Sequence, residues 1–168
     1  EHFRKALPIR LKALGPEHPS VSETYMNMGA VFQQQGDLEL AMEHYRNALA
    51  IQEKAVGPEH PDVGDTYNNM AIVFNAQGAH ERAMEHYREA LSIRLKALGP
   101  EHPSVGSTYN NMGEVFRKQG DYDRALEHYR RALAISLKAY GPEHPDVGST
   151  YNNMAIVFRQ HGKLDQAV

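Results

Sequence analysis

The sequence has no cysteine, which excludes disulfide bonds and thiolate metal sites. It also has no apolar run near the roughly 18 residues that cross a bilayer, and no segment that resembles a signal peptide. The lack of cysteine fits a reducing compartment, so we expect a cytoplasmic protein without a membrane partner. The net charge of −3 offers no broad positive field for phosphate groups, which argues against a nucleic-acid partner.

The usual motifs of catalysis are absent as well. The sequence has no phosphate-binding glycine loop, no nucleophile elbow and no His-Glu-x-x-His motif. Its glycines are spaced like the ends of helices instead. We therefore expect a protein without enzymatic activity, with no catalytic residue and no cofactor.

What the chain does contain is an internal repeat. The string Gly-Pro-Glu-His-Pro recurs every 42 positions, at residues 15–19, 57–61, 99–103 and 141–145. Four units of this length account for all 168 residues. Serine follows the string in the first and third units and aspartate in the second and fourth, so a longer period of two units is present too. A fixed period is typical of architectures built from stacked repeats.

Each unit predicts two helices and no strand. In the first helix, apolar residues recur with helical spacing at Val63, Tyr67, Met70, Ala71 and Phe74. In the second, they recur at Ala83, Met84, Tyr87, Ala90 and Leu91. The pairs Ser20/Glu23 and Asp62/Asp65 resemble capping boxes at the start of the first helix, and glycines such as Gly78 mark its end.

These signals predict an all-α chain in which short turns fold each pair of helices into an antiparallel hairpin. We expect one array over residues 1–168, because a single hairpin is too narrow to close a core. Residues 1–14 are the end of a truncated second helix, with complete hairpins over 19–56, 61–98 and 103–140. Residues 145–168 form an incomplete terminal hairpin, in which 163–168 open a second helix. Pro8 predicts a helix that is kinked or that begins near this residue.

Between Thr108 and Ile135 the pattern becomes specific. An aromatic residue, a Met-Gly pair, Gly-x-Tyr and small residues occur at fixed positions, held by Tyr109, Met112, Gly113, Phe116, Gly120, Tyr122, Ala125, Tyr129 and Ala132. This pattern resembles the tetratricopeptide repeat (TPR) signature, although that repeat is usually shorter, with about 34 residues. The Gly-x-x-His-Pro linker is similar to the repeats of kinesin light chains and of their bacterial and fungal relatives. Small residues at the positions of Gly113 and Ala125 indicate close helix crossings.

The resemblance implies a right-handed α-solenoid whose first helices line a concave groove for a peptide segment of a partner protein. By motif position, the groove residues are Asp65, Asn68, Asn75, Ser107, Asn110, Glu114, Arg117, Lys118, Ser149, Asn152 and Arg159. Asparagine is a poor helix former, so its recurrence at 68, 110 and 152 predicts a ladder of amides that hold a peptide backbone. Met26 breaks this ladder in the first unit. The adjacent Asn27, Asn69, Asn111 and Asn153 are expected to join helices.

Ten histidines raise the question of a metal site. Eight of them repeat with the period of the unit, so equivalent rings lie about 10 Å apart, one helix spacing. One ion cannot bridge that distance with bonds of about 2.0–2.1 Å. We therefore expect no metal: the Glu-His-Pro histidines cap helices, and the Glu-His-Tyr histidines lie on the surface.

Two other functions remain open. The array can be structural and associate head to tail, with residues 1–14 of one molecule against about 147–168 of the next. A helical array can also bind RNA one base per repeat, but the acidic residues in the groove disfavour this.

Overall fold

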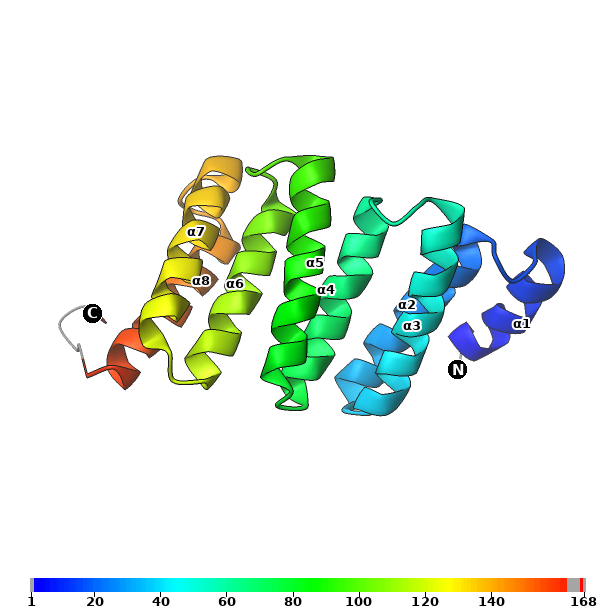
Figure 1. Ribbon diagram of the computed structural model, residues 1–168, viewed down its shortest axis with the longest axis horizontal. Coiled ribbons are helices and arrows are strands. Elements are labelled where there is room, and N and C mark those ends of the chain that lie inside the picture. Colours follow the sequence, from blue (N-terminus) through cyan, green and yellow to red (C-terminus); the bar gives the residue numbers. More distant parts are fainter. Residues whose placement is uncertain (1, 163–166, 168) are drawn as a thin grey trace. The chain divides into compact units, whose positions relative to one another are not determined.

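The computed structural model describes residues 2–162 and 167, and within them it is built from helices without any strand, which confirms the expected all-α class. The helices are shown in Figure 1. They are α1 (His2–Leu14), α2 (Pro19–Gln35), α3 (Leu38–Ala55), α4 (Pro61–Ala76), α5 (His80–Leu98), α6 (Pro103–Lys118), α7 (Tyr122–Tyr140) and α8 (Pro145–Gln160). The second helix expected over 163–168 falls almost wholly outside the described residues.

The first helix of each hairpin begins with a histidine cap. His102 has extended backbone, and its Nδ1 accepts a hydrogen bond from the amide of Ser104 at 3.2 Å. The same cap recurs at His18, His60 and His144. The prediction of histidine caps is therefore confirmed. The capping boxes proposed for Ser20 and Asp62 are wrong, because the proline after each histidine cap takes the first helical position. Ser20 and Asp62 are therefore the second residues of their helices.

The hairpin turns are as short as expected. Gly36 ends α2 with a φ of 81°, a left-handed conformation that glycine adopts without strain. The amide of Asp37 then donates to the Phe32 carbonyl at 2.9 Å, and the Asp37 carboxylate caps α3 by accepting from the amide of Leu40. Because two residues separate α2 from α3, the two helices must pack antiparallel (Figure 1).

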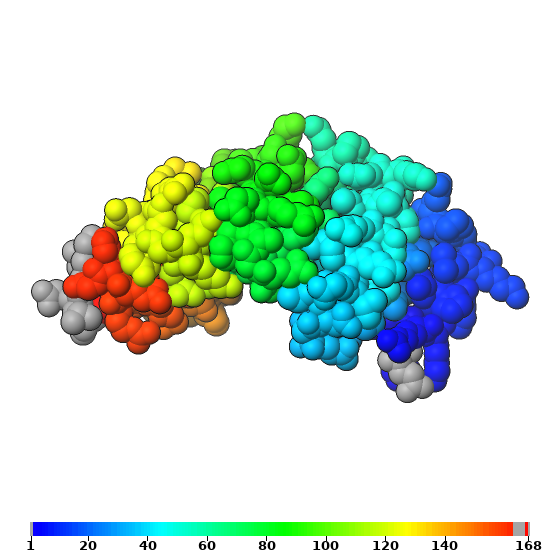
Figure 2. Space-filling view, turned by 60° about the horizontal axis from the view of Figure 1, so that its bottom comes forward, coloured from blue at the N-terminus to red at the C-terminus, as the bar shows by residue number. Residues whose placement is uncertain are grey.

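The chain forms two compact units, residues 1–93 and 94–168. In the first unit, α2 packs on α1 and α3, and α3 packs on α4. In Figure 2 the dark blue α1 lies at the edge of this unit, beside the lighter α2. In the second unit, α7 packs on α6 and α8, and α6 also contacts α8. Each unit therefore joins a complete hairpin to helices of a neighbouring repeat.

Tyrosines of the second helices fill the centre of each hairpin. Tyr45 and Tyr129 are 1% and 0% exposed. A Cβ atom added at Gly29 would lie 2.6 Å from Cε1 of Tyr45, and one added at Gly113 would lie 2.7 Å from Cε1 of Tyr129. The expected close helix crossing at Gly113 is thus confirmed, since the ring occupies the space of the missing side chain.

Pro8 lies inside α1, which runs from His2 to Leu14. The expectation that this helix begins near Pro8 is therefore wrong. A proline removes one amide donor and crowds the preceding turn, yet the helix continues through Pro8 here. The bend expected as the other outcome stays a prediction.

Candidate functional site

The residues predicted for the groove lie in different environments. Those that are exposed are Asp65, Ser107, Lys118, Ser149, Asn152 and Arg159, and those that are half-buried are Asn110, Glu114 and Arg117. Asn68 and Asn75 are buried, with 7% and 8% of their surface exposed. α4 also buries Met70, Ala71 and Val73, so it is packed on more than one side. The amide ladder is therefore not uniformly accessible, because its member Asn68 is buried, and the groove residue Asn75 is buried as well.

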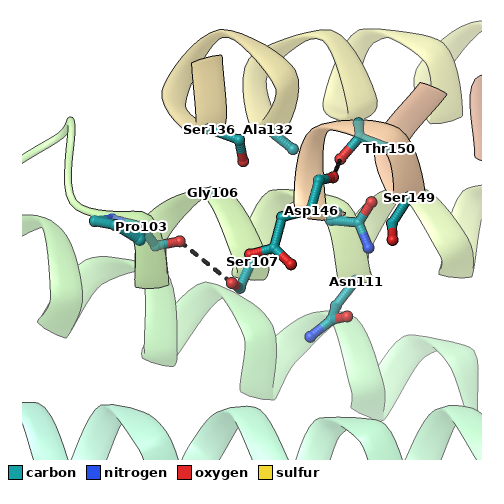
Figure 3. A pocket seen from close by; sticks show the side chains of 10 residues that line it. Pro103, Gly106, Ser107, Asn111, Ala132, Ser136, Asp146, Ser149 and Thr150 are labelled. Atoms are coloured by element: carbon teal, nitrogen blue, oxygen red, sulfur yellow. Dashed lines mark hydrogen bonds between the residues drawn. The ribbon is translucent and has the colours of Figure 1, made fainter. Parts of the chain in front are cut away.

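Three of the predicted residues surround one cavity in the second unit. This cavity has a volume of about 190 Å³ and lies among α6, α7 and α8. It brings together Ser107 and Asn110 of α6 and Ser149 of α8. Figure 3 shows Ser107 and Ser149 beside the cavity, with Ser136 and Ala132 reaching toward it from α7. Polar side chains of two repeats thus meet around one opening.

An equivalent cavity lies in the first unit. It measures about 450 Å³, and its lining includes Glu23 and Met26 of α2, Gln52 of α3, and Asp65 of α4. Each of these residues lies two repeats before a residue that lines the other cavity, as Glu23 does before Ser107. The two sites therefore occupy the same place in successive pairs of repeats, with different side chains. The first-unit cavity has three carboxylates in its lining, because Asp62 joins Glu23 and Asp65.

The asparagines of α6 and α8 bond to each other. Nδ2 of Asn153 donates to Oδ1 of Asn110 at 3.1 Å. Asn153 thus makes the contact between helices that was expected of its position, and it uses one oxygen of Asn110 to do so. The amide group of Asn110 keeps its own donors for a ligand.

A charged cluster extends the site along α6. Arg117 makes a bidentate pair with Glu114, at 2.6 and 2.8 Å, and the Tyr129 hydroxyl donates to the same carboxylate at 3.2 Å. Burial, the largest single effect, raises the pKa of Glu114, but the hydrogen bonds from Arg117 and Tyr129 and the positive charges of Arg117 and Lys118 leave that pKa below its ordinary value. The carboxylate is therefore charged at neutral pH. Its arginine is fixed in place rather than free to reorient.

Sequence reasoning missed a contact that links a second helix to the following first helix in each unit. Arg94, which is 6% exposed, donates from Nη1 to Oγ1 of Thr108 at 2.6 Å and to the Ser104 carbonyl at 2.9 Å. Arg10 makes the equivalent pair of contacts two repeats earlier, at 2.9 and 2.6 Å. A guanidinium, buried at Arg94 and half-buried at Arg10, thus joins two repeats in each unit.

In the other two repeats, the position equivalent to Arg10 and Arg94 carries a shorter side chain, Gln52 or Ser136. Gln52 accepts a hydrogen bond from Oγ1 of Thr66 at 2.6 Å. Ser136 makes no hydrogen bond with any residue that the structure describes, although Thr150 stands opposite it as Thr66 stands opposite Gln52. The signal for this series was in the sequence, since each of the four residues precedes a threonine by 14 positions. Each cavity is lined by one of the two residues, Gln52 or Ser136, that stand in place of this arginine.

The Glu-His-Tyr histidines are not simple surface residues, so that expectation is wrong. Their rings are half-buried against phenylalanines, with centroids 5.2 Å apart for His44 and Phe32 and 4.9 Å apart for His128 and Phe116. Each precedes a buried tyrosine and so lies at the edge of the packed face. Burial lowers the pKa of both imidazoles. Over residues 2–162 and 167, no three His, Cys, Asp or Glu side chains are grouped to hold a metal ion.

Comparison with known proteins identifies the repeat. The family model described as tetratricopeptide repeat matches residues 1–54, 20–96, 85–138 and 104–168. A search of curated proteins found no match. No helix in the described part of the chain has the length and apolar character needed to span a membrane.

Solved structures share the fold. BtubC (BKLC) from P. vanneervenii is 29% identical with a TM-score of 0.85, and the match covers 98% of this chain and 66% of that one. A Podosopora anserina structure with nearly identical TPR-like repeats of kinesin light chain type is 25% identical with a TM-score of 0.76, covering 98% and 78%. Aspartyl phosphate phosphatase F from Bacillus subtilis, at 20% identity and a TM-score of 0.86, shows the fold alone and is covered over 41% of its length. This chain therefore spans less than two thirds of the first and third of these proteins.

Proposed function

Because the chain belongs to the tetratricopeptide repeat family, we propose that it is a binding scaffold that holds a peptide segment of a partner protein. The observation that carries this proposal is the recurrence of one cavity, two repeats apart, among the first helices. Each cavity is lined by residues from two repeats, and each opens between exposed polar side chains. An extended peptide offers backbone donors and acceptors at regular intervals, which such a surface can pair. The proposal requires no catalytic step and no cofactor.

The part of the surface best suited to this role is the rim of the second-unit cavity. Ser107 and Ser149 are exposed, and Asn110 has donors to offer. The charged pair of Glu114 and Arg117 continues the surface along α6. Asn152, Lys118 and Arg159 are exposed on the same two helices and extend the contact area. In the first unit, Asp65 takes the corresponding place.

The test uses random peptides displayed on phage and selected on the intact chain. A synthetic copy of an enriched peptide is then titrated by fluorescence anisotropy. Replacing Ser107, Asn110 and Ser149 together with alanine should weaken binding at least tenfold, while circular dichroism shows unchanged helix content. The matched control replaces the exposed Arg88 and Arg130, on α5 and α7, and should bind like the wild type. If no peptide is enriched, or if the triple variant binds equally well, the proposal fails.

Self-association is a second candidate, which exposed apolar side chains favour. Ile9 and Leu14 of α1 are 68% and 46% exposed, and Tyr151 of α8 is 53% exposed. Apolar groups in water favour contact with another apolar surface. Sedimentation velocity over a hundredfold range of concentration should then show a rising coefficient, and Ile9→Lys should abolish the rise. A constant coefficient would remove this candidate. Binding of RNA that weakens steeply with salt would instead favour the nucleic-acid alternative.

A further inference from the structure

The cavity of the second unit lies where a guanidinium is bound one repeat earlier. Ser136 holds the position of Arg94, but its side chain is too short to reach α8. The groups that receive the guanidinium are nevertheless present. Oγ1 of Thr150 donates to the Asp146 carbonyl at 2.9 Å, and in the same way Oγ1 of Thr108 donates to the Ser104 carbonyl at 3.0 Å. Each hydroxyl therefore keeps a lone pair for a further donor.

The space left by the missing arginine has the right size. A dry cavity of about 150 Å³ in another protein accepts benzene, so about 190 Å³ has room for the planar end of an arginine. Thr150 and Ser136 are 4% and 8% exposed and form the deep part of the cavity. Ser107, Asp146 and Ser149 are exposed and form its mouth, and Figure 3 shows the Asp146 carboxylate directed toward the space between the helices. A side chain can thus enter from the peptide-binding side.

The charge of the lining suits a cation. Among the described residues that line the cavity, Asp146 is the one that carries a charge. The nearby His144 accepts at Nδ1 from the Asp146 amide at 3.2 Å, and the same nitrogen lies 3.8 Å from Oδ2 of the Asp146 carboxylate. The positive end of α8 opposes a cation here. Arg94 lies in the same relation to the start of α6, which shows that direct acceptors outweigh the helix dipole.

We propose that this cavity binds the guanidinium of an arginine side chain in the bound peptide. The proposal rests on the proposed function and gives it a specificity: the peptide supplies the side chain that the repeat lacks. A carbonyl, a hydroxyl and a carboxylate converge on the cavity, and the five donors of a planar guanidinium match them better than the point charge of a lysine. The first-unit cavity, with Gln52 and three carboxylates, offers related chemistry.

The test titrates N-acetyl-arginine methylamide into the ¹⁵N-labelled intact chain and follows amide chemical shifts. We expect saturable shifts at Gly106, Asp146 and Thr150, on both sides of the cavity. N-acetyl-citrulline methylamide has the same shape without the charge, and it should bind at least tenfold more weakly. Equal binding of the two compounds, or no saturable shift at these residues with arginine, would overturn the proposal.

Variants locate the site. Ser136→Arg fills the cavity from within, as Arg94 does, and should abolish the shifts while raising the melting temperature. Ala134→Arg adds the same charge at an exposed position two residues away and should leave binding intact. Thr150→Val removes the acceptor with little change in volume and should weaken binding at least fivefold. If Ser136→Arg and Thr150→Val, both folded by circular dichroism, bind the arginine compound like the wild type, the assignment is wrong.

The two proposals fail separately. If selected peptides bind the intact chain and lose affinity in the triple variant of Ser107, Asn110 and Ser149, the scaffold function stands. If those peptides lack arginine and bind Ser136→Arg with unchanged affinity, the proposal of an arginine site is wrong, although the scaffold function stands. If no peptide binds but the arginine compound does, the cavity recognises a guanidinium without a peptide function.

Discussion

Nδ2 of Asn153 lies 3.1 Å from Oδ1 of Asn110, and this hydrogen bond joins the first helices of two successive repeats. Asn153→Ala removes the donor and leaves a half-buried oxygen without its partner. We expect the free energy of unfolding to fall by about 1 kcal/mol, the usual net contribution of such a hydrogen bond. Urea denaturation measures the change. Asn152→Ala, at the exposed neighbouring position, is the control and should change stability by less than about 0.5 kcal/mol. Equal effects at the two positions would contradict this account.

Replacing a glycine with alanine should have opposite effects on stability at Gly113 and at Gly148. At Gly113 a Cβ atom would lie 2.7 Å from the Tyr129 ring, whereas at Gly148 it would meet nothing within 4 Å. Overpacking costs about 1–3 kcal/mol, and alanine in place of glycine within a helix gains up to about 1 kcal/mol. Gly148→Ala should therefore stabilise the chain, and Gly113→Ala should destabilise it. Melting temperatures of the two variants give the signs, and a higher value for Gly113→Ala would show that the ring moves aside freely.

The histidine caps are expected to contribute to stability. His102→Ala leaves the Ser104 amide without its acceptor and should cost about 1 kcal/mol, within the range of about 0.5–2 kcal/mol known for helix caps. His102→Asn should retain most of that stability, because its side-chain oxygen can accept the same bond. Urea denaturation at pH 7.5 compares the two. A cap role is wrong if asparagine and alanine at this position are equally destabilising.

Stability should decrease with acid because of the half-buried imidazoles. Burial is the largest cause of the lowered pKa of His128 and of His44. As pH falls below the ordinary value of 6.5, the unfolded chain takes up protons before the folded chain does. The stability present above pH 6.5 is therefore lost progressively, down to the lower pKa of the folded state. The urea midpoint should be lower at pH 5.5 than at pH 7.5.

Substitution of the half-buried His128 separates this effect from that of carboxylates. His128→Gln should reduce the difference between the two midpoints, since glutamine does not titrate. His2→Gln, at an exposed position, should leave the difference unchanged. If His128→Gln keeps the full pH dependence, the imidazole is not its source.

The periodic features of this chain were readable from the sequence because they follow from local geometry. Helix spacing, the glycine ends and the small residue at Gly113 each depend on neighbours within one repeat. The histidine cap was also expected, although Ser20, the residue proposed for a capping box, lies two positions after the cap at His18. What escaped prediction depends on contacts between repeats. The burial of Asn68 was missed because motif position does not give the depth of a side chain, and Asn110 was not expected to be the partner of Asn153.

The series that includes Arg94 and Ser136 shows the same limit. Its four residues are of three types, arginine twice and then glutamine and serine, so only the threonine opposite stays constant. The cavity beside Ser136 becomes visible once helices from two repeats are packed together. Bulk composition and spacing could therefore predict a binding array but not which of its surfaces is open.

The alternation of arginine with shorter residues also limits how such a gene can change in length. Recombination between every second repeat inserts or deletes one arginine position together with one position of a shorter residue, so the alternation is preserved. Recombination between adjacent repeats puts two arginine positions, or two positions of shorter residues, next to each other and shifts every later repeat by one. A lineage that must keep a partner would therefore retain changes made in pairs and lose those made singly.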